Sequence, residues 1–125
     1  MKNDCLFCKI ANKEIPSLIL YEDDDIIVIL DAFPNVDGHT LVIPKKHFED
    51  IYDVDDETLL KMIKFGKIQA KKNMAKLNKE SLTFLFNYGD AQKIKHIHLH
   101  LLPNFIEAKE LKYTKEEVYK ILSEE

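Results

Sequence analysis

The stretch His96-Ile97-His98-Leu99-His100-Leu101-Leu102-Pro103 decides the fold and carries the chemistry of this 125-residue chain. Its histidines alternate with apolar residues, which is the period-two pattern of a β-strand with one polar and one apolar face. We therefore expect a strand over residues 95–102, with the three histidines on one face and roughly 6–7 Å between neighbours. Three imidazoles along one strand face are costly to bury unless they bind or react, so the pattern predicts a functional site.

Three such histidines could act as metal ligands or as reacting groups. A single catalytic metal is disfavoured, because a spacing of about 6.6 Å exceeds what two Zn–N bonds of about 2.1 Å span. The spacing suits a division of labour better, with one imidazole attacking phosphorus and another contacting the phosphate. A neutral imidazole is a competent nucleophile near pH 7 when its other nitrogen donates to a backbone carbonyl. A metal-dependent hydrolase stays open as an alternative.

The rest of the chain predicts short helices, one long helix and further strands. We expect a helix over 5–14, a hairpin of strands 18–21 and 26–30 around an acidic turn, and strands over 39–44 and 81–88. Asp55 and Asp56 can cap a long helix that ends near Leu77, and a capping box at Thr114 starts a final helix over about 114–123. This order favours an α+β fold with an antiparallel sheet. No linker or repeat divides the chain, so residues 1–125 are expected to form a single domain.

Composition narrows the function classes. Eighteen basic and twenty-two acidic side chains give a net charge of −4, which argues against broad electrostatic binding to nucleic acid or to an anionic membrane. No apolar run approaches the roughly 20 residues of a transmembrane helix, and the first residues lack the apolar region of a signal peptide. We expect a cytoplasmic enzyme or binding domain.

The histidine strand and its surroundings resemble a known family. His96-x-His98-x-His100-x-x, with x apolar, is similar to the signature of the histidine triad (HIT) family of nucleotide hydrolases and transferases. Segments 7–10, 14–16, 21–23 and 38–47 and the motif Asn87-x-Gly89 resemble its framework in order, so the resemblance covers about residues 5–103. The small Hint-like branch is the most similar. The resemblance implies a HIT-like fold, a five-stranded antiparallel sheet with one long and short flanking helices, paired in a homodimer through the long helix and the adjacent strand.

The resemblance also implies an activity on a small-molecule purine nucleotide. His98, the middle histidine, would attack the α-phosphorus of a nucleoside phosphoramidate, an acyl-adenylate or a dinucleoside polyphosphate, and water would then release the nucleoside monophosphate. His100 would contact the phosphate and the leaving group, and His96 completes the catalytic triad. The family needs no catalytic metal and no organic cofactor for this chemistry. A dinucleoside polyphosphate hydrolase, or a nucleotide-binding HIT domain with weak catalysis, remains an alternative to a phosphoramidase.

A nucleotide pocket is implied as well. Asp31 would bind the ribose hydroxyls, and Asn87 and Gln92 would hold phosphate oxygens. Four apolar side chains would flank the purine, although the hydrophobic core would suit them equally: Phe7, Ile10, Ile29 and Leu41.

The loop before the histidine strand departs from the family pattern. Ala91-Gln92-Lys93 stands where the family commonly has Gly-Gln-Ser or Gly-Gln-Thr, and the loop from Asn87 looks shortened. A small hydroxyl residue that donates to phosphate is thereby lost. Lys93 either supplies a cation to the phosphate in its place or points to solvent.

The two cysteines, Cys5 and Cys8, form half of a tetrahedral zinc site at most. In several bacterial HIT proteins a similar pair binds one structural zinc, together with a histidine at the position of His47 and the first triad histidine, here His96. The resemblance therefore implies a structural zinc at these four residues. In the alternative, both cysteines are small buried thiols and His47 lies on the surface. We expect His39 to pack and hydrogen-bond beside the active strand.

Overall fold

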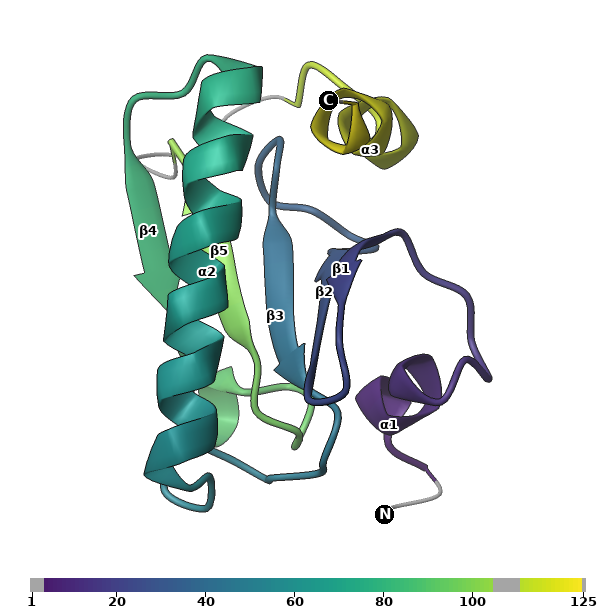
Figure 1. The fold of residues 1–125 in the computed structure, drawn as a ribbon, viewed down its shortest axis with the longest axis vertical. Coiled ribbons are helices and arrows are strands. Elements are labelled where there is room, and N and C mark those ends of the chain that lie inside the picture. Colours follow the sequence, from purple (N-terminus) through teal and green to yellow (C-terminus); the bar gives the residue numbers. More distant parts are fainter. Residues whose placement is uncertain (1–3, 105–110, 125) are drawn as a thin grey trace.

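The computed structural model describes residues 4–104 and 111–124 of the chain. Five strands form one sheet in the order β1-β2-β3-β5-β4, and every neighbouring pair is antiparallel. Figure 1 shows α2 running along the sheet with α3 near its upper end, whereas α1 lies on the other side of the strands. The elements are α1 (Leu6–Ala11), β1 (Ile19–Glu22), β2 (Ile26–Leu30), β3 (Thr40–Pro44), α2 (Asp56–Leu77), β4 (Leu82–Leu85), the 3-10 helix η1 (Gly89–Ala91), β5 (Leu99–Pro103) and α3 (Lys115–Ser123). The predicted α+β fold with a five-stranded antiparallel sheet is confirmed.

The two faces of the sheet bury different clusters. On one face, residues of β2, β3 and β5 pack against α2 around Met62 and Ala70. Gly66 allows this close approach, because a Cβ there would lie 2.7 Å from Leu99 Cδ2. On the other face, Ile29 and Leu41 pack together with side chains of α1. The strand register pairs Ile29 with Leu41 and Leu41 with His100, so the polar face of β5 lies on the α1 side of the sheet.

The long helix α2 begins after Asp55, whose side chain accepts from Thr58 N, and ends at Asn78 with a positive φ of 55°. The cap at Asp55 is as predicted. The buried face of α2 includes two polar residues, Gln69 and Asn73. Gln69 Nε2 donates to Asn73 Oδ1 at 2.8 Å, and Asn73 Nδ2 donates to Thr40 Oγ1 at 3.0 Å. These polar side chains therefore tie α2 to the start of β3.

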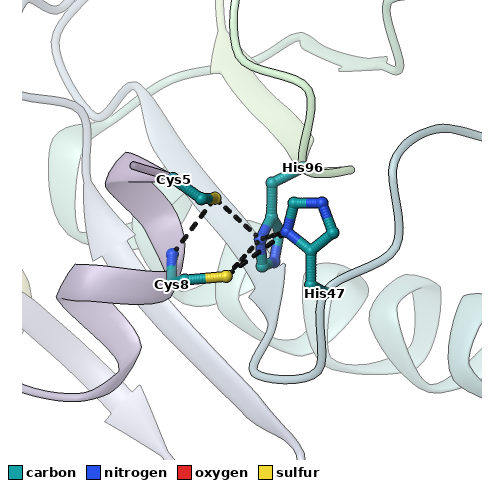
Figure 2. A group of neighbouring side chains, drawn as sticks. All are labelled: Cys5, Cys8, His47 and His96. Atoms are coloured by element: carbon teal, nitrogen blue, oxygen red, sulfur yellow. Dashed lines mark hydrogen bonds between the residues drawn. The ribbon is translucent and has the colours of Figure 1, made fainter. Parts of the chain in front are cut away.

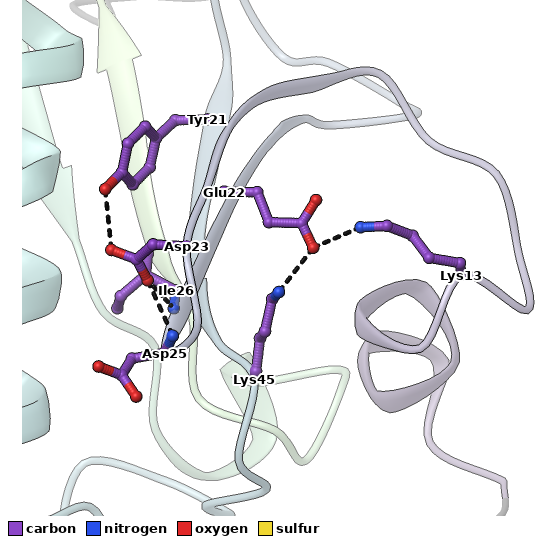
Figure 3. Close-up of polar contacts among 7 residues, drawn as sticks. All are labelled: Lys13, Tyr21, Glu22, Asp23, Asp25, Ile26 and Lys45. Atoms are coloured by element: carbon purple, nitrogen blue, oxygen red, sulfur yellow. Dashed lines mark hydrogen bonds and ion pairs between the residues drawn. The ribbon is translucent and has the colours of Figure 1, made fainter.

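The acidic hairpin turn is held by its own carboxylates (Figure 3). Asp23 accepts from the backbone N–H groups of Asp25 and Ile26, both at 2.8 Å, and from the Tyr21 hydroxyl at 2.8 Å. Burial alone would raise the pKa of Asp23, but these hydrogen bonds outweigh it and hold the pKa at about 2. The turn is thus stabilised in the form in which Asp23 is ionised.

Glu22 links three segments of the chain near the same turn. Its carboxylate pairs with Lys13, which follows α1, and with Lys45, which follows β3, at 2.6 Å. Figure 3 shows both lysines converging on one carboxylate oxygen. These exposed pairs contribute little stability individually, but they mark where the α1 segment meets the hairpin.

The strand boundaries around the histidines differ from the prediction. The strand β5 begins at Leu99, not at residue 95, and residues 94–96 form a bend. Ile97 N donates to Phe48 O at 2.8 Å, which draws this segment toward the loop after β3. His96 and His98 therefore precede the strand, and only His100 lies within it.

The C-terminal helix α3 has the predicted capping box, in which Thr114 and Glu117 exchange hydrogen bonds. Its Val118 and Leu122 pack with Leu30 of β2 and with α2. Within the described part of the chain, no helix combines the length and apolar character needed to cross a membrane.

Candidate active site and metal centre

Four potential metal ligands converge beside the histidine segment (Figure 2). Cys5 and Cys8 lie at the start of α1, His47 follows β3, and His96 precedes β5. Cys5 Sγ lies 3.3 Å from His96 Nδ1, and Cys8 Sγ lies 3.3 Å from His47 Nδ1 and 3.5 Å from His96 Nδ1. The two Nδ1 atoms are 3.1 Å apart, and all four ligand atoms lie within 4.8 Å of one another. The chain thus brings two thiols and two imidazoles together from three separate segments.

The chemistry of this group fits zinc. His96 Nε2 lies 2.7 Å from the Pro44 carbonyl oxygen, so this nitrogen carries the proton and Nδ1 presents its lone pair to the cysteines. The Nδ1 atoms of His47 and His96 lie only 3.1 Å apart, so a proton or a metal ion is needed between their lone pairs. A tetrahedral zinc with Zn–S bonds of about 2.3 Å and Zn–N bonds of about 2.05 Å sets its ligand atoms roughly 3.3–3.8 Å apart. The separations in the cluster lie close to that range, so these residues could hold a zinc ion.

His98 is oriented by a backbone hydrogen bond. Its Nδ1 lies 2.8 Å from the carbonyl oxygen of His96, so Nδ1 donates and Nε2 keeps a free lone pair. The Phe7 ring packs edge-on against it, with 4.8 Å between the ring centroids. Burial lowers the pKa of His98. The imidazole is thus fixed in one tautomer, with the free nitrogen that a nucleophile needs.

His100 is oriented by His39. The N–H of Asn35 donates to His39 Nδ1 at 3.1 Å, so neutral His39 carries its proton on Nε2. This nitrogen lies 2.9 Å from His100 Nδ1 and 3.5 Å from Asp31 Oδ2. His100 therefore accepts at Nδ1 and carries its own proton on Nε2. Asn87 Nδ2 lies 3.4 Å from this nitrogen and is also a donor, so the two do not hydrogen-bond to each other and both N–H groups are available to a ligand. Burial, followed by the nearby His98 and His39, lowers the pKa of His100 to about 4, so it is uncharged at neutral pH.

A pocket of about 760 Å³ opens over these histidines. His98 and His100 line it together with seven of the eight residues expected to bind nucleotide, namely Phe7, Ile10, Ile29, Asp31, Leu41, Asn87 and Lys93. The apolar members come from α1, β2 and β3, whereas Asn87 and Lys93 flank η1. An apolar pocket with a few polar groups beside two oriented imidazoles is the usual form of a small-molecule site.

Comparison with known proteins shows the family. A sequence model of the HIT domain matches residues 12–107. The chain belongs to the HIT family. An uncharacterised HIT-like protein of Methanocaldococcus jannaschii is 38% identical over 103 residues, which cover 81% of this chain and 79% of that relative.

Two further similarities bear on this HIT protein. The adenylylsulfatase HINT3 of Arabidopsis thaliana is 36% identical over 105 residues, which cover 82% of this chain and 53% of that protein, and it supports the Hint-like branch. A zinc-bound histidine triad protein of Mycobacterium smegmatis has a similar structure, with a TM-score of 0.87, 34% identity, and coverage of 96% of this chain and 91% of that one. The chain therefore has the HIT fold.

Gln92 of this HIT protein lies elsewhere than expected. Its side chain is 3% exposed and does not line the pocket. Nε2 donates to the carbonyl oxygens of Glu49 at 2.7 Å and Ile94 at 3.0 Å, so the amide holds the η1 loop against the loop after β3. Unlike the other residues expected to bind nucleotide, Gln92 thus has both side-chain N–H groups bonded to backbone carbonyl oxygens outside the pocket.

His96 is also turned away from the pocket. It is fully buried and faces the cysteines, and it reaches the triad through its backbone carbonyl, which accepts from His98. The His96 side chain therefore belongs to the candidate metal centre, and the His96 backbone carbonyl orients His98. A reacting role for the His96 side chain is not supported by this position.

Sequence reasoning missed several pocket residues. Phe33, at the rim, is 87% exposed and lines the pocket. Lys115 and Glu116, in the first turn of α3, line it too, and Lys115 Nζ lies 3.5 Å from the Ala32 carbonyl oxygen. No local sequence pattern indicates that Lys115 and Glu116 line the pocket, because α3 reaches the pocket only through tertiary packing. The aromatic Phe33, two residues after Asp31, was the one available signal.

Proposed function

We propose that this HIT protein hydrolyses purine nucleotides at the α-phosphorus through a nucleotidyl intermediate on His98, with nucleoside phosphoramidates as substrates. The hydrogen bond from His98 Nδ1 to the His96 carbonyl carries this proposal, because it leaves Nε2 free beside the pocket. Family membership supports hydrolase chemistry on nucleotides. The resemblance to the Hint-like branch supports the phosphoramidase form.

The first step transfers the nucleotidyl group to the protein. The lone pair of His98 Nε2 forms a bond to the α-phosphorus, and the bond from phosphorus to the leaving nitrogen breaks. The nitrogen keeps the electron pair and takes one proton from solvent, so that it leaves as an amine. His100 Nε2–H, held in place by His39, donates to the phosphate and leaving-group side. Asn87 lies next to it and is suited to a phosphate oxygen. Fixed donors of this kind stabilise charge that develops on phosphate oxygens.

The second step releases the nucleotide. The oxygen of a water molecule bonds to phosphorus, and the P–Nε2 bond breaks and returns its electron pair to His98. One proton passes from that water to solvent, which balances the proton taken up by the amine in the first step. Throughout both steps Nδ1 keeps its proton, because the His96 carbonyl accepts it. The imidazole thus ends in the state in which it began.

The nucleoside would occupy the apolar part of the pocket. Asp31 Oδ1 accepts from Phe33 N at 2.8 Å, which fixes the carboxylate, while its other oxygen can accept from a ribose hydroxyl. Phe7 and Ile10 of α1 and Ile29 and Leu41 of the sheet suit the faces of a purine. An acidic group beside an apolar wall is a common means of binding a nucleoside.

We propose a structural role for zinc at Cys5, Cys8, His47 and His96. When bound, zinc would crosslink α1 to the loop after β3 and to the segment that carries the triad. Its ligand His96 supplies the carbonyl that orients His98. The residues of the chain perform the nucleotidyl transfer without a metal in any step.

We also propose that two copies pair through α2 and β4. The edge strand β4 and the exposed face of α2 carry three of the exposed large apolar side chains, Leu60 at 68%, Ile68 at 57% and Phe84 at 37%. Sedimentation equilibrium tests this pairing. A dimer that Ile68→Lys dissociates would support it, and a monomeric wild-type protein at high concentration would contradict it.

Turnover and binding together test the function. We expect His98→Asn to abolish hydrolysis of adenosine phosphoramidate while calorimetry still detects AMP or GMP binding. Wild-type turnover in His98→Asn would contradict the mechanism. Tight binding without turnover in the wild-type protein would instead favour a nucleotide-binding HIT domain. Loss of turnover on chelation, with stability unchanged, would favour the metal-dependent hydrolase.

A further inference from the structure

Lys93 places a positive charge on the rim of the pocket. Among the cationic side chains of residues 4–104 and 111–124, only Lys93 and Lys115 line the pocket. Lys115 lies beside Ala32, on the Asp31 side, whereas Lys93 comes from the segment that also contributes Asn87 and Ala91. Asn87 and Lys93 flank the same short helix η1, and the Asn87 amide lies next to His100, so Lys93 enters the pocket from the same loop as the donor beside His100.

The charge of Lys93 is not neutralised by a carboxylate. Its ammonium donates to the backbone carbonyl oxygen of Asp90 at 3.1 Å, and no ion pair within the described residues includes it. A carbonyl partner orients the ammonium and leaves its full charge available to a ligand. The side chain is exposed, so it can move toward a bound anion at little cost.

The neighbouring Lys95 provides a contrast on the same loop. Its ammonium donates to the Gly89 carbonyl oxygen at 2.7 Å, and Lys95 does not line the pocket. Two lysines two residues apart therefore differ in whether they face the site. This difference supplies a matched control.

The other polar groups on this side of the pocket are uncharged. His100 is neutral at pH 7, because its pKa is lowered to about 4, and Asn87 is an amide. Neither group provides a full positive charge to a leaving group that departs as an anion. Lys93 can provide it, and the same charge would repel a leaving group that carries an ammonium.

We propose that Lys93 is a specificity-determining residue that raises the rate for nucleotides whose leaving group is an oxyanion, sulfate or phosphate, relative to the rate for phosphoramidates, which remain substrates. This rests on the proposed nucleotidyl transfer to His98. In that step the bond between the α-phosphorus and the bridging oxygen breaks, and the oxyanion leaves with the electron pair and needs no proton. An amine must gain a proton to leave, and the neutral His100 is a poor source of it. Lys93 thus replaces the lost hydroxyl donor with a charge and extends the substrate range from phosphoramidates toward nucleotides with oxyanion leaving groups.

Three substrates and three variants test the assignment. Adenylyl sulfate, diadenosine tetraphosphate and adenosine phosphoramidate are compared in the wild type, Lys93→Ser, Lys93→Arg and Lys95→Ser. We expect Lys93→Ser to lower the ratio of kcat/KM for the oxyanion substrates to that for the phosphoramidate by about tenfold or more, as expected for loss of a charged group facing developing charge. Lys93→Arg keeps the ratio, and Lys95→Ser leaves all three values unchanged.

The outcomes separate the possible ligands and the possible errors. If Lys93→Ser lowers kcat/KM for adenylyl sulfate alone, Lys93 interacts with a sulfate leaving group. If it lowers kcat/KM for diadenosine tetraphosphate alone, Lys93 interacts with a phosphate leaving group. An unchanged ratio in Lys93→Ser, or an equal fall in Lys95→Ser, overturns the proposal. His98→Asn is assayed in parallel, because its retained turnover would refute the nucleotidyl intermediate whatever the Lys93 ratio. Added KCl should also reduce the oxyanion rates more in the wild type than in Lys93→Ser.

Discussion

The buried hydrogen-bond chain between α2 and β3 gives a sharp test of how the fold holds the site. Asn73 and Thr40 are fully buried, and Asn73 Nδ2 donates to Thr40 Oγ1, which donates to Gly38 O at 2.8 Å. Thr40 adjoins His39, the residue that orients His100. Thr40→Val keeps the shape of the side chain and removes its hydroxyl.

The cost of Thr40→Val follows from the partners that it leaves behind. Two hydrogen bonds of about 1 kcal/mol net each are lost, and the buried Asn73 N–H stays unpaired at a further cost of about 1–3 kcal/mol. We therefore expect the free energy of unfolding to fall by about 3–5 kcal/mol. In an Asn73→Leu background the Asn73–Thr40 bond is already absent and no orphaned donor remains, so Thr40→Val should cost about 2–4 kcal/mol less there.

Urea unfolding of the four proteins measures this difference as a double-mutant cycle. Protein and zinc concentrations are held fixed, because binding and association shift apparent stability. If Thr40→Val costs the same in both backgrounds, the two side chains are not coupled and the hydrogen-bond chain does not stabilise the protein. A changed m-value would instead show that the unfolding transition itself differs.

Three further predictions concern the metal, the acidic turn and the ribose. Elemental analysis of Cys8→Ser should find well below one zinc ion per chain, and unchanged zinc content would contradict the site. The Tm of Cys8→Ser should also fall, since zinc at 100 times its Kd adds about 2.7 kcal/mol of stability. The pKa of Asp23 lies near 2 when folded, below its ordinary 3.8, so its stabilisation is present above about pH 4 and is lost as the pH falls toward 2. Partial exposure limits this loss to about 1–2 kcal/mol, and acid titration of Asp23→Asn should lack it. Asp31→Asn should raise the Kd for AMP about tenfold but not that for 2′,3′-dideoxy-AMP; an equal effect on both would exclude a ribose contact.

The alternating histidines predicted the side chains that face the pocket better than they predicted the course of the backbone beside them. Period two placed His98 and His100 on one side correctly, because alternation along an extended chain needs no tertiary information. It did not predict that the chain bends before Leu99, since that bend depends on the contact between Ile97 and Phe48. The family framework likewise indicated the cysteines and His47, which lie in segments far apart in sequence.

The misplaced residues share a physical cause. Gln92 and Asn73 are polar in sequence yet buried in the fold, because each finds specific hydrogen-bond partners far away along the chain. Local periodicity reports hydrophobicity and carries no information about such partners. Lys115 was missed for a related reason, since only the packing of α3 on β2 and α2 brings it to the pocket.

Detection of the covalent intermediate tests the central claim most directly. The wild-type protein is mixed with excess adenosine phosphoramidate, quenched in mildly basic solution within the first turnover, digested, and analysed by mass spectrometry. We predict one AMP group on the peptide that contains His98, located on the His98 imidazole, and none in His98→Asn. AMP release in a full single turnover without any adduct, or an adduct on His100 in place of His98, would contradict the account.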